Sequence, residues 1–62
     1  MSQSDRWKYL VIRLKAGWSG NVPEERLQNE LNSQGSLGWE LVSILPIHQG
    51  YSGVKLVFKR PA

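Results

Sequence analysis

The sequence predicts a small α+β domain in which three antiparallel strands, in the spatial order 1-3-2, carry one helix on one face. Three stretches are rich in aromatic, aliphatic and β-branched residues, an amphipathic stretch separates the first two, and a glycine-rich turn joins the last two. A β-α-β crossover followed by a hairpin is most simply satisfied when the third strand lies between the other two, antiparallel to both. The resulting β-α-β-β arrangement is half of a ferredoxin-like fold.

The first half of the chain supplies one strand and the helix. We expect the strand at residues 6–15, where aromatic and branched side chains dominate, and we expect residues 1–5 to be disordered. The helix is expected at residues 22–34, since Pro23 suits a first helical turn and the acidic residues after it favour the positive end of the helix dipole. Gly35 is expected to stop the helix by taking the left-handed conformation.

The second half supplies the hairpin, with strands expected at residues 39–46 and 53–60. Pro46 has no backbone N–H to donate to a sheet, which favours ending the second strand there. In the third strand, apolar residues alternate with lysines and are assigned to the helix face: Val54, Leu56 and Phe58. Both sides of the first two strands are apolar, so alternation alone leaves their orientation open.

The length of the chain limits how it is stabilised. Its 62 residues form one domain, 1–62, and a domain of this size buries only about 60% of the surface that its unfolded chain exposes. Cysteine is absent, and His48 is the only imidazole, whereas structural zinc needs four nitrogen or sulfur ligands. We therefore expect no metal and no cofactor, and we expect a homo-oligomer, with a dimer favoured.

Three motifs resemble a widespread family of short bacterial proteins that is known only as a domain of unknown function. They are a W-x-Y-x-V strand at 7–11, an L-N-x-x-G-x-x-G-W-E-L-V turn at 31–42 and a final F-K-R-P at 58–61. The family brings no established reaction, cofactor or substrate. Because the intervening positions of its first strand are often polar, the resemblance implies that these residues face the helix: Trp7, Tyr9, Val11, Trp39 and Leu41.

With that assignment, the sheet face opposite the helix is apolar. Its expected members are Leu10, Ile12, Leu14, Val42, Ile44 and Val57. One helix with two leucines covers only one face, and an exposed apolar patch beyond a few hundred Å² usually marks an interaction site. The leading hypothesis is therefore a non-enzymatic interaction module that forms a homodimer through this outer face.

Single-stranded nucleic acid is the alternative partner. The net charge is +3 and the sequence pI is near 9.7, and all basic residues but Arg26 fall on or beside the strands. The candidate contacts to an anionic partner are Lys8, Lys55, Lys59 and Arg60. Lysines at sheet edges also discourage aggregation, and we favour that interpretation because the first-strand aromatics are assigned to the core. Trp18, in a glycine loop, is a candidate anchor for a partner.

No catalytic constellation is present in the sequence. There is no cysteine nucleophile, His48 is expected in the hairpin loop, and no serine has an evident base and orienting acid. Glu40, an acid within a strand, is expected to pair with Lys55 on the neighbouring strand. No apolar run approaches the roughly 20 residues of a membrane span, so we expect a cytoplasmic protein without membrane contact.

Overall fold

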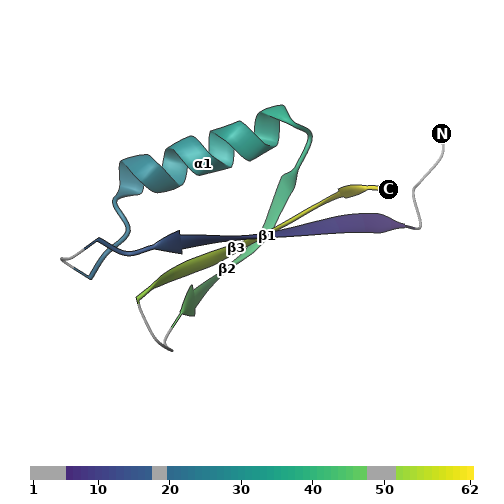
Figure 1. The fold of residues 1–62 in the computed structure, drawn as a ribbon. Coiled ribbons are helices and arrows are strands. Elements are labelled where there is room, and N and C mark those ends of the chain that lie inside the picture. The colour runs from purple at the N-terminus through teal and green to yellow at the C-terminus, as the bar shows by residue number, and fades with distance from the viewer. Residues whose placement is uncertain (1–5, 18–19, 48–51) are drawn as a thin grey trace.

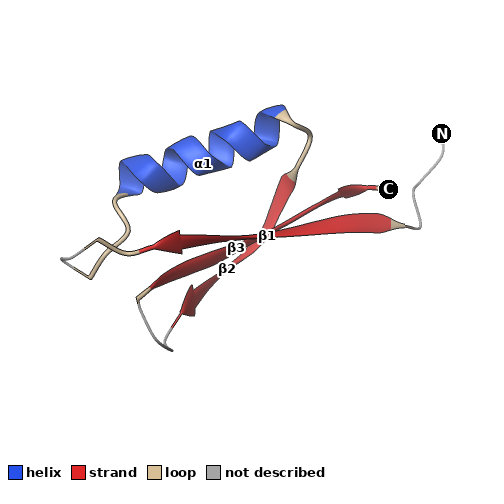
Figure 2. Cartoon of the chain, in the orientation of Figure 1, coloured by secondary structure: helices blue, strands red, loops and turns tan. Residues whose placement is uncertain are grey.

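The expected architecture is confirmed. The computed structural model describes residues 6–17, 20–47 and 52–62. In chain order the elements are β1 (Trp7–Lys15), α1 (Glu24–Ser36), β2 (Glu40–Ile47) and β3 (Gly53–Pro61). The three strands form one sheet in the order β1-β3-β2, with β3 antiparallel to both neighbours. Figure 1 shows α1 lying along one side of this sheet, and Figure 2 shows no other helix among the described residues.

The helix ends later than predicted, because Gly38 and not Gly35 closes it. Gly35 lies within α1, whereas Gly38 has φ +91°, in the left-handed region that favours glycine. The Gly38 N–H donates to the Gly35 carbonyl at 3.0 Å, and the Trp39 N–H donates to the Gln34 carbonyl at 3.0 Å. This pair of bonds is a Schellman motif, which satisfies the carbonyls that the last helical turn leaves without partners.

Strand β2 continues through Pro46, so the predicted end at this proline is wrong. At the two ends of the β1–β3 pair, the Ala62 N–H donates to the Arg6 carbonyl and the Ala16 N–H donates to the Ser52 carbonyl. With the unbroken register between these ends, the even-numbered residues of β1 and β3 therefore hydrogen-bond to each other. In antiparallel pairs the direction of the backbone groups alternates along the strand, so odd-numbered residues of β3 bond to β2. Pro46 lies opposite the even-numbered Val54, and its nitrogen therefore faces away from β3. A missing N–H costs the sheet nothing at this position.

The core lies between β3 and the helix. Leu14, Leu56 and Phe58 are buried, which confirms the helix face assigned to β3. Seven partly buried side chains pack against these three: Leu10, Ile12, Val22, Leu27, Leu31, Trp39 and Val54. The helix itself contributes no fully buried residue, so the single apolar layer is thin.

The orientation of β1 is the reverse of the one that the family resemblance implies. Leu10, Ile12 and Leu14 face the helix, because each lies opposite a helix-facing residue of β3 and opposed residues share a face. The predicted core residues of this strand are exposed: Trp7 by 40%, Tyr9 by 63% and Val11 by 56%. Leu10, Ile12 and Leu14 belong to the same apolar cluster as Leu27 and Leu31 of the helix, which leaves the aromatic side of β1 uncovered.

Strand β2 is divided by a β-bulge between Leu41 and Ser43. Leu41 lies opposite Phe58 and Trp39 packs on the core, as predicted. Ile44 lies opposite Leu56 and so belongs to the helix side, contrary to its predicted place on the outer face, although it is 41% exposed. Val42 lies at the bulge and is 50% exposed.

Candidate functional site on the open sheet face

The sheet face opposite α1 combines aromatic, aliphatic and basic side chains. We call it the open face, and the register assigns to it Trp7, Tyr9, Val11, Arg13, Lys15, Glu40, Ser43, Leu45, Lys55, Val57 and Lys59. Of the predicted outer-face residues, only Val57 is placed here by its register. Four of the described open-face residues are basic and one is acidic, so the face is electropositive.

Two exposed aromatic rings lie at one end of the open face. Trp7 and Tyr9 are two residues apart on β1, so both project from the same side of the strand, about 7 Å apart. Tyr9 lies opposite Lys59, and the Lys59 ammonium lies 4.3 Å from the centroid of the Trp7 ring. This cation–π contact holds a positive charge beside the Trp7 ring, on the side of the sheet that the helix does not cover.

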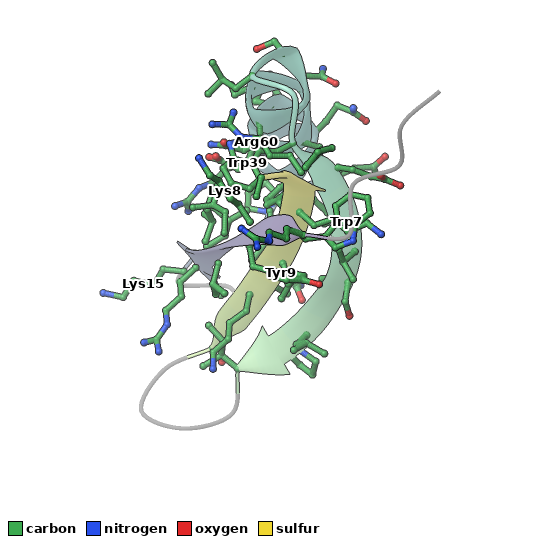
Figure 3. All side chains as sticks on the ribbon, turned by 90° about the vertical axis from the view of Figure 1, so that its right-hand side faces the viewer. Trp7, Lys8, Tyr9, Lys15, Trp39 and Arg60 are labelled. Atoms are coloured by element: carbon green, nitrogen blue, oxygen red, sulfur yellow. The ribbon has the colours of Figure 1, made fainter. Side chains whose placement is uncertain are left out.

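The four predicted anion-binding cations are divided between the two faces. Lys55 and Lys59 lie on the open face, whereas Lys8 and Arg60 oppose each other on the helix side. Figure 3 shows Lys8, Arg60 and Trp39 on the side of the sheet nearest the helix, and Tyr9 on the opposite side. The prediction from the sequence is therefore correct for two of the four cations, and the other two lie on the helix side of the sheet.

Arg60 has a structural role at the end of α1. Its Nη1 donates to the Leu37 carbonyl at 2.7 Å, and its guanidinium lies 4.4 Å from the centroid of the Trp39 ring. A positive charge at this position also favours the negative end of the helix dipole. Adjacent residues of the terminal F-K-R-P motif therefore have different roles. Lys59 lies on the open face, whereas Arg60 stabilises the glycine-tryptophan turn that follows α1.

Two other sequence predictions concern residues around the site. Glu40 lies opposite Lys59, so the predicted pairing with Lys55 is wrong, and Leu45 occupies the position opposite Lys55. Trp18 and His48 fall outside the residues that the structure describes.

Sequence reasoning missed Trp7, Tyr9 and Arg13 as open-face residues. A usable signal was present, because Arg13 and Lys15 share the odd-numbered side of β1 with the two aromatic residues. Two charges on that side against Lys8 alone on the other side favour the odd-numbered side as the exposed one. The family resemblance outweighed this charge pattern and led to the opposite orientation.

The described residues contain no metal site, no pocket and no membrane-spanning helix. Among them, no three side chains of the metal-ligating types lie close enough together to hold a metal ion. No pocket is present in this part of the chain. No helix in the described ranges is long and apolar enough to cross a membrane.

Comparison with known proteins identifies a family and no activity. No curated protein and no solved structure matches the chain significantly. The family model DUF4177, a domain of unknown function, matches residues 7–61, which is almost the whole chain. This protein therefore belongs to the DUF4177 family.

Proposed function

We propose that this protein is a small binding module, not an enzyme, and that its open face binds single-stranded nucleic acid. The observation that carries the proposal is the exposure of Trp7 and Tyr9 beside Lys59 on an uncovered sheet. The proposal includes the cytoplasmic location expected from the sequence.

The aromatic rings supply the first part of the binding energy. A base presents a flat π-face that stacks on an aromatic side chain, with a contribution of about 1–3 kcal/mol per base. Trp7 and Tyr9 project from one side of β1, so two separate bases can each contact one ring. A duplex offers fewer such contacts, because its bases are already stacked on each other. The face therefore favours single strands over double strands.

The basic side chains supply the second part. Arg13, Lys55 and Lys59 lie along β1 and β3 on the same face as the rings, and Glu40 at the margin is acidic. A phosphodiester backbone that follows these cations releases counterions, which makes affinity fall as salt rises. The combination of ring faces and cations matches a chain that carries both bases and phosphates.

Self-association through the open face is the competing use of this surface. Val11 and Val57 oppose each other at its centre and would support an apolar contact. However, a two-fold contact would also bring the basic residues of one copy toward those of the other, and like charges in an interface cost several kcal/mol. Charge complementarity therefore favours a polyanion over a second copy on this face.

The proposal is tested by fluorescence anisotropy with a labelled single-stranded oligonucleotide and its duplex, at about 50 and 200 mM salt. Lys59→Gln removes a charge from the open face, and Lys8→Gln removes the same charge from the helix side of the neighbouring strand. We expect Lys59→Gln to weaken binding and to reduce the salt slope by about 0.7, while Lys8→Gln leaves both unchanged.

Two outcomes contradict the proposal. One is the absence of binding at low salt, and the other is an equal loss of affinity in the two variants. If Val57→Asp, on the central strand of the open face, lowers the solution mass and single strands do not bind, self-association through the open face is the correct function.

A further inference from the structure

We propose that β1 pairs with β1 of a second copy of this chain, antiparallel and two-fold symmetric about Leu10, to form a continuous six-stranded sheet. The inference concerns the edge of the sheet and is independent of the function proposed for the open face. It rests on the backbone directions in β1, the irregularities of β2 and one side-chain contact at the end of β1.

The outer edge of β1 presents a regular row of backbone groups. Even-numbered residues of β1 bond to β3, so the N–H and C=O groups of odd-numbered residues point away from the sheet. The pairing of β1 with β3 covers all nine residues from Trp7 to Lys15 without a register shift. Such an edge is a template for another strand.

The edge of β2 lacks this regularity. A bulge between Leu41 and Ser43 interrupts its pairing, and Pro46 provides no N–H at an outward-facing position. Bulges and prolines are the features that natural sheets use to prevent pairing at an edge. The two edges thus differ, and β1 is the one that can accept a strand.

A contact from the helix sets the register of the pairing. The Arg26 Nη1 donates to the carbonyl of Lys15 at 2.9 Å and occupies the last outward acceptor of β1. The remaining outward groups belong to Trp7, Tyr9, Val11 and Arg13, and the midpoint of this stretch is Leu10. Antiparallel pairing about Leu10 uses all of them and leaves the contact of Arg26 intact.

The side chains are complementary in this register. On the open face, Trp7 lies opposite Arg13 of the second copy, and Tyr9 lies opposite Val11 of the second copy. A cation against an indole ring and an aromatic ring against a β-branched residue are both favourable cross-strand pairs. On the helix side, Leu10 meets Leu10 and Lys8 meets Ile12, so no cation opposes a cation. The charges on β1 therefore do not prevent this edge from pairing with β1 of a second copy.

Amide hydrogen exchange of the unmodified protein tests the pairing directly. We expect the outward amides of Tyr9, Val11 and Arg13 to exchange more slowly at high than at low protein concentration, by a factor on the order of ten. The outward amides of Leu41 and Ile44 on the other edge are the control and should show no such dependence. Fast exchange of the three β1 amides at every concentration overturns the proposal, and association through the open face gives that same result.

Single cysteines test the register, because the chain contains no cysteine of its own. In the proposed pairing the two Leu10 Cα atoms are about 4.5 Å apart, within the range of a disulfide, whereas the two Ile12 Cα atoms are more than about 13 Å apart. We expect Leu10→Cys to form a covalent dimer under mild oxidation and the matched helix-side variant Ile12→Cys to remain monomeric. Crosslinking of Ile12→Cys to the same or a greater extent overturns the register about Leu10.

Discussion

The orientation of β1 predicts that Leu14→Ala destabilises the protein far more than Val11→Ala. Leu14 is 4% exposed and belongs to the buried core, whereas Val11 is 56% exposed on the open face. Truncation of a buried leucine to alanine costs about 2–5 kcal/mol, from lost transfer free energy and the cavity that remains. Truncation of Val11 costs at most about 1 kcal/mol, through reduced strand propensity.

These costs are large against the stability of so small a domain. At about 0.05–0.15 kcal/mol per residue, a chain of 62 residues has roughly 3–9 kcal/mol of unfolding free energy. Leu14→Ala is therefore expected to remove about half of it, and Val11→Ala a small fraction. With only three buried side chains among the described residues, the core has little capacity to repack around the cavity.

Urea unfolding followed by tryptophan fluorescence measures the difference, with all proteins at one concentration because association would add to apparent stability. With an m-value near 1 kcal/mol/M, typical of small domains, Leu14→Ala should lower the midpoint by about 2 M or more. Val11→Ala should lower it by less than about 1 M. Equal shifts, or a larger shift for Val11→Ala, would refute the orientation of β1 described above.

Three further predictions concern the backbone and the end of the helix. Gly38→Ala should lower the unfolding free energy by about 1–2 kcal/mol, because Gly38 has φ +91°. Gly35→Ala, inside α1, should raise the unfolding free energy by about 0.5–1 kcal/mol. Equal effects of the two substitutions in thermal unfolding would contradict the assignment of Gly38 as the residue that closes the helix. Gly53→Ala should destabilise the protein more than Gly38→Ala does, because Gly53 has φ +155° and a Cβ there would collide with the Leu14 carbonyl oxygen. A loss of Tm below about 4 °C would argue against this close approach of Gly53 to Leu14. Arg60→Met keeps most of the aliphatic stem and loses the hydrogen bond to the Leu37 carbonyl, which should lower the unfolding free energy by about 1 kcal/mol. An unchanged midpoint in urea unfolding would show that this hydrogen bond does not stabilise the turn.

The open face and the β1 edge are separate surfaces that can be occupied together. Pairing of two β1 strands leaves both open faces on the same side of one sheet, because antiparallel neighbours share their faces. The Trp7 and Tyr9 rings of the two copies would then lie on either side of the two-fold axis. In that assembly a longer single strand could contact four rings instead of two, which predicts tighter binding at protein concentrations where the sheet is paired.

Much of the fold was determined by local patterns in the sequence. The order of the elements follows from residue composition, and the helix face of β3 follows from the alternation of Leu56 and Phe58 with Lys55 and Lys59. The 1-3-2 strand order follows from the connection rules for a crossover and a hairpin. These features depend on neighbours in the chain or on general topology, and so a single sequence suffices.

The structure decided which side of β1 is covered, where α1 ends and whether β2 passes Pro46, and the sequence had offered only a weak charge signal for the first of these. Both sides of β1 are apolar, so its orientation depends on the pairing of Leu10 with Phe58 and on the packing of Leu14 in the core. Gly38 closes the helix because its backbone bonds to the last turn, and Pro46 is tolerated because its nitrogen faces away from β3. The orientation of β1 and the course of β2 past Pro46 depend on contacts between segments distant in sequence, whereas the bonds that close the helix at Gly38 are local. The candidate site was misplaced because it lies on the side of β1 that the distant contacts left exposed.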